Sequence, residues 1–424
     1  MDTIDSIPLK KTRTTLSEDW VVVVIGFLII LLTIAGFKTL LPSFNWSGTA
    51  DLASQVFSTQ NLLAIAAQFL FIYVIAFLAV FLNGKPLTAF LYNFPVVYLI
   101  TIAALIITGN EAVKALNLEA VIFSLAIGLL IGNLFNLPSW FREALSTEMF
   151  VKIGLVLLGT GVIFSDILKA GSYGLLQALV VVLSVWYFAF WISRKLKIDN
   201  ELAVMISSAV SICGVSAAIA TAGAIKGDTK KLSYVISLVL ITAIPMMIGM
   251  PYLAKYMGLN QEVTGAWLGG TIDTTGAVVA SGTLVGETAL KISTIVKFSQ
   301  NVLLGIAAFI ISIYWTYTNN PAANSDSKPT LGVIWERFPK FVIGFVGASL
   351  LFSFFITPDV IKAGKESLKG LQNLWFALAF TSIGLETKFS DLVKSNNRKP
   401  LYAFLIAQTF NILITLLIAY ILFR

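Results

Sequence analysis

Residues 269–282, GGTIDTTGAVVASG, break the apolar pattern that surrounds them with glycines, hydroxyl side chains and one carboxylate, Asp273. Across the whole chain 57% of residues are hydrophobic and only 12% are charged. A soluble domain carries about 25% charged residues, so most of this surface must face lipid. Asp273 therefore lies in a membrane-embedded region, where an ionisable side chain is costly and indicates a functional site.

A second stretch of the same kind lies upstream, at residues 208–224, SAVSICGVSAAIATAGA. Small residues in membrane helices usually allow close packing, and for Gly128 and Gly132 we keep that interpretation. The two polar stretches differ because hydroxyls accompany glycines that loosen a helix. Broken helices expose backbone amides that hold an anion and carbonyls that hold a cation. We predict two broken helices whose breaks bind a small anion through Ser211, Cys213, Gly214, Ser216, Thr271, Thr274, Thr275 and Gly276.

The next apolar segment carries three polar side chains on one helical face. Gln300 and Asn301 follow Lys297 at spacings of three and four residues, which places all three side by side on a helix. We therefore add them to the substrate-binding site. Lys297 would neutralise the bound anion or pair with Asp273, unless it snorkels to the membrane interface, as we expect of Lys291. Asp273 would be the ion-coupling residue for Na⁺ or H⁺, and we expect no other cofactor.

Apolar segments long enough to cross a bilayer recur along the chain. A span needs ~20 mostly apolar residues. Thirteen segments are candidates: 21–41, 62–82, 94–108, 120–136, 150–164, 173–193, 202–225, 232–252, 262–284, 289–317, 341–356, 371–384 and 401–422. Several are short or glycine-rich, so one or two can be re-entrant hairpins, and the pattern leaves open whether 202–225 and 262–284 cross fully. We expect an all-α polytopic membrane protein with about 10–13 transmembrane helices.

Lys and Arg are more frequent in the loops on the side of the N-terminus, which predicts a cytoplasmic N-terminus. Lys226, Lys230 and Lys231 are exceptions if every segment crosses. Either residues 202–225 do not cross fully, or this loop attracts anions from the far side.

Two short segments echo one another and predict internal symmetry. Residues 159–169, GTGVIFSDILK, resemble residues 384–394, GLETKFSDLVK, and each ends a short span. An odd number of spans separates them, so the two would run in opposite directions. Inverted repeats of this kind are a recurrent feature of transporters.

Several motifs resemble those of the sulfate exporter family of YeiH-like bacterial membrane proteins. They are AIGLLIGN at 126–133, KIGLVLLGTGV at 152–162, SICGVSAAIATAGAIK at 211–226, LGGTID at 268–273 and ALKISTIVKFSQNVLL at 289–304. The resemblance covers roughly residues 120–422. It implies a helical anion transporter distantly similar to the bile-acid/sodium symporter superfamily, with inverted repeats, crossing broken helices and elevator-like motion.

The chain departs from this family at positions that bear on the substrate. Family members carry a His-Glu pair and a later Gln where this chain has Asp273, Thr274 and Ala277, and a basic residue where it has Gln300. The site here is less basic. Sulfate, a sulfonate or a carboxylate therefore all stay open as the substrate class.

These features divide the chain into five expected parts. They are a cytoplasmic tail, extra N-terminal helices that form a scaffold, the first part of a transporter core with both broken segments, a cytoplasmic linker, and C-terminal transporter helices. Their bounds are 1–20, 21–118, 119–317, 318–340 and 341–424.

The sequence predicts a secondary transporter of a small anion in the bacterial inner membrane, working as a homodimer. An anion channel and a non-transporting membrane sensor are the alternatives. An enzyme is disfavoured because the chain has no histidine and one cysteine, which removes the usual general bases and nucleophiles. The net charge of +7 fits positively charged cytoplasmic loops, so we expect no nucleic-acid partner.

Overall fold

The computed structural model describes residues 16–37, 40–115, 120–319, 332, 335, 338–387 and 398–424. In these ranges the chain is almost entirely helical. Six helices are long and apolar enough to cross a membrane: Thr59–Leu82, Leu87–Thr108, Phe164–Lys195, Lys231–Tyr256, Glu287–Trp315 and Lys399–Phe423. The prediction of an all-α polytopic membrane protein is confirmed.

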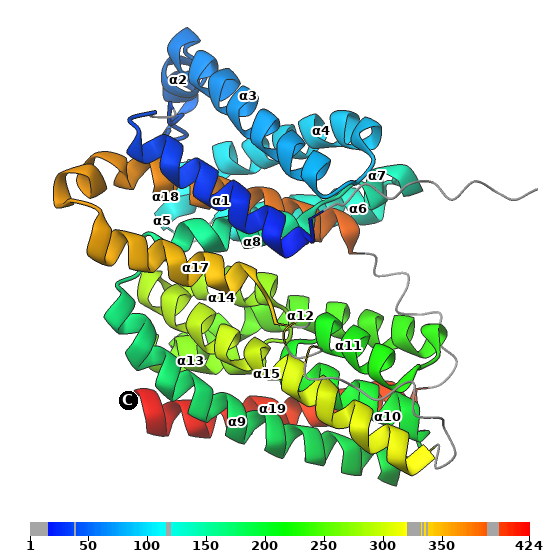
Figure 1. Ribbon diagram of the computed structural model, residues 1–424. Helices are drawn as coiled ribbons and strands as arrows, with labels where there is room; N and C mark the ends of the chain where they lie inside the picture. Colours follow the sequence, from blue (N-terminus) through cyan, green and yellow to red (C-terminus); the bar gives the residue numbers. More distant parts are fainter. Residues whose placement is uncertain are drawn as a thin grey trace, which may run out of the picture.

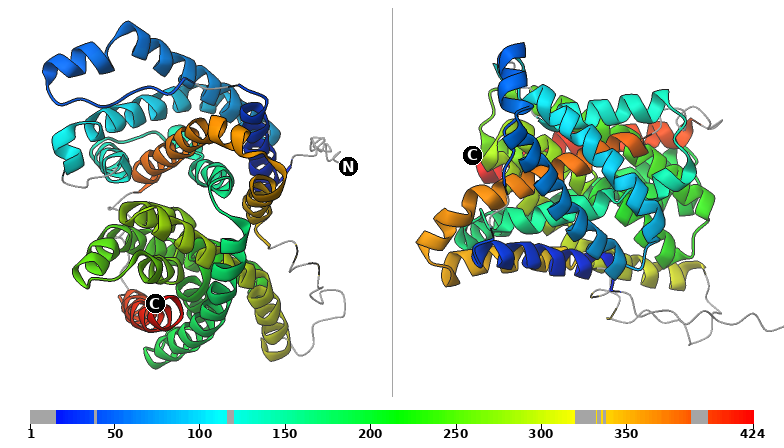
Figure 2. Two further views of the ribbon diagram at one scale, coloured as in Figure 1. Left: turned by 90° about the vertical axis from the view of Figure 1, so that its left-hand side faces the viewer. Right: turned by 90° about the horizontal axis from the view of Figure 1, so that it is seen from above.

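The helices form two bundles that lie side by side (Figures 1 and 2). The flanking bundle contains α1 (Glu18–Ile34), α3 (Thr59–Leu82), α4 (Leu87–Thr108), α6 (Ala120–Leu134), α8 (Thr147–Gly159), α17 (Phe341–Leu350) with its π-helical end η4 (Leu351–Phe355), and α18 (Pro358–Glu386). Short helices α2 (Thr49–Asp51), η1 (Leu52–Val56), α5 (Glu111–Ala115) and α7 (Ser139–Glu143) connect them.

The hairpin bundle contains the two segments that were predicted to be broken. Its helices are α9 (Phe164–Lys195), α10 (Asn200–Ser208), η2 (Ala209–Cys213), α11 (Val215–Ile225), α12 (Thr229–Tyr256), α13 (Gln261–Thr271), α14 (Thr275–Val285), α15 (Glu287–Asn319) and α19 (Lys399–Phe423). The chain passes between the bundles after α8, after α15 and after α18. Residues 341–424 are therefore shared between the two bundles, because α19 packs on α9 and α13.

The predicted first hairpin segment does not cross the molecule. Helices α10 and α11 fold back on each other, so that the backbone amide of Asp228 donates to the Glu201 carboxylate. Lys231 then closes the mouth of the hairpin with ion pairs of 2.7 Å to Asp199 and 2.6 Å to Glu201. Partial burial raises the pKa of Asp199, but the hydrogen bond and charge of Lys231, together with the hydrogen bond from the Leu202 amide, bring that pKa below its ordinary value.

The second segment also turns back on itself. Gly286, which follows α14, lies so close to the start of α13 that a β-carbon placed on it would be 2.7 Å from Gln261 Oε1. Helix α15 then runs alongside α13, since Gly265 faces the backbone of Ala289. Residues 261–286 therefore form a helical hairpin. If they crossed as one interrupted helix, their two ends would lie a full helix length apart.

Two of the thirteen predicted spans are thus re-entrant, and eleven are left. The hairpins enter from opposite ends of the molecule, because α12 runs from the mouth of the first to the mouth of the second. This arrangement places Lys226 and Lys231 at the same end as Arg194. The exception to the positive-inside pattern arises only if residues 202–225 cross, and the hairpin agrees with the first of the two explanations, that they do not cross fully.

Several other predicted segments fall partly or wholly outside the described residues. They are most of the tail 1–20, most of the linker 318–340, and the greater part of the echo at 384–394.

Close packing of α6 on α18 explains the small residues Gly128 and Gly384. A β-carbon on Gly128 would overlap the carbonyl oxygen of Thr381, and one on Gly384 would lie 2.6 Å from the amide nitrogen of Leu129. The packing interpretation of Gly128 therefore agrees with the structure.

We expect Gly128→Ala to lower the free energy of unfolding by about 1–3 kcal/mol, because the backbones must separate. Gly249→Ala is the control, since a β-carbon there meets nothing within 4 Å. Thermal unfolding of the purified variants measures both. Equal unfolding temperatures for the two variants would contradict the close approach of α6 and α18.

Candidate functional site

The tip of the first hairpin is a π-helical turn that ends at a glycine in a backbone conformation that other residues rarely adopt. Residues of η2 lead into Gly214, whose φ of 59° and ψ of −113° suit only glycine. Its amide donates to Ala209 O at 2.9 Å. A β-carbon on Gly214 would lie 3.0 Å from Asp273 Cβ, so the two hairpin tips touch at this point.

The tip of the second hairpin is a short extended link between two half-helices. Helix α13 ends at Thr271, and Ile272 has extended backbone angles of −73° and 131°. Thr274 caps the next helix, since its hydroxyl accepts from the amide of Ala277 at 3.3 Å. Asp273 therefore sits in the link itself, 1% exposed, rather than inside a continuous span.

Lys297 joins the two tips from behind. Its ammonium group donates to Ile212 O at 3.0 Å, to Ile272 O at 2.8 Å and to Gln300 Oε1 at 2.8 Å. Among the described residues Lys297 forms no ion pair with Asp273, so the structure does not show the pairing that stood among the roles left open for Lys297. The reason is that the carbonyls freed at both helix interruptions present a closer and more complete set of acceptors.

Two amide side chains also bridge the hairpins, through the carbonyls that lie one and two positions before Ile212 and Ile272. Gln300 donates to Ser211 O at 2.8 Å and to Gly270 O at 3.2 Å. Asn411 of α19 donates to Val210 O at 3.0 Å and to Thr271 O at 3.3 Å. Three consecutive carbonyls of each hairpin are thus satisfied by Lys297, Gln300 and Asn411, each of which contacts both hairpins.

Asn411 and its neighbour Gln408, which donates to Thr271 O at 3.1 Å, were not predicted. Gln408, Asn411 and Thr415 stand at spacings of three and four in an otherwise apolar helix. This is the same pattern that identified the stripe beginning at Lys297, and it would have found them.

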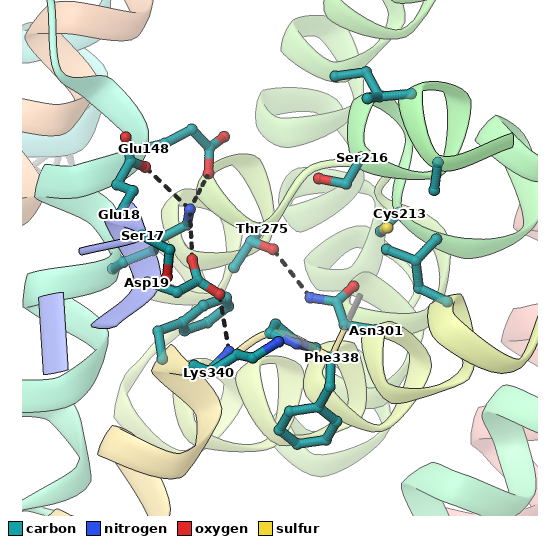
Figure 3. Close-up of a pocket in the computed structure, with 16 residues that line it drawn as sticks. Ser17, Glu18, Asp19, Glu148, Cys213, Ser216, Thr275, Asn301, Phe338 and Lys340 are labelled. Atoms are coloured by element: carbon teal, nitrogen blue, oxygen red, sulfur yellow. Dashed lines mark hydrogen bonds and ion pairs between the residues drawn. The ribbon is translucent and has the colours of Figure 1, made fainter. Parts of the chain in front are cut away.

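The front of the tips opens into a cavity of about 370 Å³ between the two bundles (Figure 3). Cys213, Ser216, Thr275 and Asn301 line it from the hairpin bundle. The amide of Asn301 donates to the hydroxyl of Thr275 at 3.4 Å. Four of the predicted residues are therefore brought together around one space.

The opposite wall of this cavity is charged and belongs largely to the flanking bundle. Lys152 of α8 pairs with Glu18 and Asp19 of α1, both at 3.1 Å. Asp19 also accepts from the backbone amide of Lys340 at 2.8 Å. Figure 3 shows this cluster facing Thr275 and Asn301 across the cavity.

A neighbouring cavity of about 370 Å³ reaches the other side of the second tip. Thr274 and Gly276 line it, together with Val215 at the start of α11. The N-termini of α11 and α14 therefore both border open space on the side of the flanking bundle.

Three predicted residues, Ser211, Thr271 and Asp273, line neither of these cavities. The hydroxyl of Ser211 donates to Ser207 O of its own helix at 2.7 Å. The hydroxyl of Thr271 and Asp273 Oδ2 are buried and have no hydrogen-bond partner in the described part of the chain. An orphaned carboxylate oxygen at the meeting point of two hairpins is costly in a buried site, which favours a role in binding a cation or proton.

Fold and site together define a polytopic helical membrane protein in which two re-entrant hairpins from opposite ends meet at a buried polar centre. Residues 93–403 match the family described as conserved hypothetical protein 698. The chain belongs to this family, whose relatives are named UPF0324 membrane proteins.

Relatives from several bacteria match most of the chain. A UPF0324 membrane protein of Rhodopirellula baltica is 42% identical over 366 residues, which cover 83% of this chain and 67% of that protein. One from Nitratidesulfovibrio vulgaris is 39% identical over 356 residues, which cover 80% of this chain. The chain spans 60% of the length of that second relative. No solved structure matches.

Proposed function

We propose that this protein is a secondary active transporter of a small anion of the sulfate, sulfonate or carboxylate class. The observation that carries the proposal is the opposed pair of hairpins. Their inner C-terminal ends are closed by protein donors, whereas the N-termini of α11 and α14 border cavities. Half-helix N-termini carry partial positive charge and free amides, and transporters use them to hold anionic groups.

The side chains at these N-termini suit an oxyanion or carboxylate. Ser216 and Thr275 offer hydroxyl donors, and Asn301 offers an amide donor, in the same cavity. Lys297 adds a positive charge behind the tips without contacting the cavity. The resemblance to sulfate exporters supports the sulfate class, while the absence of a basic residue at Gln300 keeps sulfonates and carboxylates open.

Access to the tips from one end supports an elevator-like alternating-access mechanism. A cavity of about 620 Å³ at the opposite end is lined by Gly286 and Glu287, at the base of the second hairpin, and contains none of the tip residues. The hairpin bundle would slide against the flanking bundle, which would also supply the homodimer contact. We place the protein in the bacterial inner membrane with a cytoplasmic N-terminus, and assign coupling to Na⁺ or H⁺ at Asp273.

The test is flux of labelled sulfate, a small sulfonate and a small carboxylate into proteoliposomes. We expect one class to be transported and to exchange against itself. Thr275→Val should lower its apparent affinity about 10- to 100-fold, as a lost hydrogen bond to a charged group contributes about 1.5–3 kcal/mol. Ser237→Ala is the matched control, because its hydroxyl only donates to Ser233 O of its own helix.

Absence of flux for all three classes would contradict the proposal. Conductance without exchange would favour an anion channel instead. A Thr275→Val variant that transports with wild-type affinity would exclude this cavity as the substrate site.

A further inference from the structure

The proposed anion site at the front of the tips gives no direct role to Lys297, whose charged side chain is buried. Its side chain is 1% exposed. An ammonium group has three hydrogens to donate, and all three are taken by Ile212 O, Ile272 O and Gln300 Oε1. No hydrogen is left for a ligand. The group is therefore coordinated in the manner of a bound cation.

The carbonyls of Ile212 and Ile272 belong to the ends of half-helices, and this makes the site attractive to a positive charge. Helix η2 ends at Cys213 and α13 ends at Thr271, and a helix C-terminus carries partial negative charge. In transporters with interrupted helices such C-terminal ends and unwound carbonyls coordinate a free cation. Here a tethered ammonium group fills that position, and the amides of Gln300 and Asn411 occupy the next carbonyls.

We propose that Lys297 is the resident cation of a carbonyl site shared by both hairpins, standing where a free sodium ion would otherwise bind. Sodium does not occupy this site in the wild-type protein, and the tips stay joined without it. As a statement about coupling, the inference rests on the proposed transport function, because it leaves Asp273 as the remaining position for a coupling ion. The site itself exists whether or not an anion is transported.

The test is thermal unfolding of the purified full chain in choline, sodium or methylammonium chloride at equal ionic strength, with no other anion added. Lys297→Ala leaves room for a small cation among the carbonyls. Lys297→Met fills the same room with apolar atoms. Lys291→Ala is the control on the same helix, because Lys291 is partly exposed and, within the described ranges, its ion pair is with Glu287, at 3.2 Å.

We expect the wild type and Lys291→Ala to respond alike to the three salts, so that any sodium binding at Asp273 is common to both and is subtracted. Lys297→Ala should unfold several degrees lower in choline and recover in sodium or methylammonium, while Lys297→Met should be lowered in every salt. If Lys297→Ala yields folded protein only when it is extracted into sodium or methylammonium, the inference is supported as well.

Two results would overturn it: a Lys297→Ala variant that neither small cation stabilises more than it stabilises the wild type, or recovery of Lys297→Met by sodium. None of these measurements involves the transported anion. The inference can therefore fail while the proposed function stands, and the reverse is equally possible.

Discussion

Gly214→Ala is expected to destabilise the protein by about 3 kcal/mol or more and to abolish anion binding. Holding an alanine at the native backbone angles of Gly214 costs about 1–3 kcal/mol. The added atom would also lie 2.7 Å from Val239 Cγ1 and 3.0 Å from Asp273 Cβ. It would therefore push apart the two tips that form the site. Thermal unfolding and anion titration of the purified variant measure the two effects.

Gly258→Ala separates the strain from the clash. Gly258 also has a positive φ, of 68°, but a β-carbon there meets nothing within 4 Å. We expect this control to lose about 1–2 kcal/mol and to keep its ligand response. Similar losses in both variants, or unchanged anion binding by Gly214→Ala, would show that the hairpin tips do not meet.

Gln300→Leu is expected to lower the free energy of unfolding by about 3 kcal/mol or more. The change leaves Ser211 O and Gly270 O without their donor and removes one acceptor from Lys297. Each buried polar group left unsatisfied costs about 1–3 kcal/mol. Chemical or thermal unfolding in detergent measures the loss.

Ser299→Ala, at the adjacent position of α15, is the matched control. Its hydroxyl donates to Ile295 O of its own helix at 3.0 Å and only weakly to α9. We expect a change below about 1 kcal/mol. A Gln300→Leu variant as stable as this control would mean that the bridging of both hairpins contributes nothing to the fold.

The sequence was sufficient for the helical membrane class and for both helix interruptions, because each depends on local composition. It could not show that each interruption is a turn. Whether a chain continues or folds back after Gly214 depends on contacts made elsewhere, such as those between Lys231 and Glu201. The only local indication was the charge of the loop at Lys226, which disagreed with a crossing helix.

The same limit applies to the site. The spacing of Lys297, Gln300 and Asn301 correctly placed them on one face near the interruptions. Lys297 and Gln300 donate to backbone carbonyls of two hairpins far apart in the chain, and backbone acceptors leave no trace in residue types. Asp273 was the acceptor that the residue types made visible, so pairing with it stood among the possible roles of Lys297. The structure gives Lys297 carbonyl partners instead.

The most direct test of the central claim is stabilisation of the purified protein by sulfate, a small sulfonate and a small carboxylate, for the wild type and for Ser216→Ala and Thr275→Val. Binding to the folded state raises the unfolding temperature, and at a fixed ligand concentration tighter binding raises it further. If the opposed helix N-termini hold the anion, one class will stabilise the wild type by several degrees and both variants by clearly less. If no class stabilises the wild type, or if both variants respond as the wild type does, the hairpin tips are not an anion site.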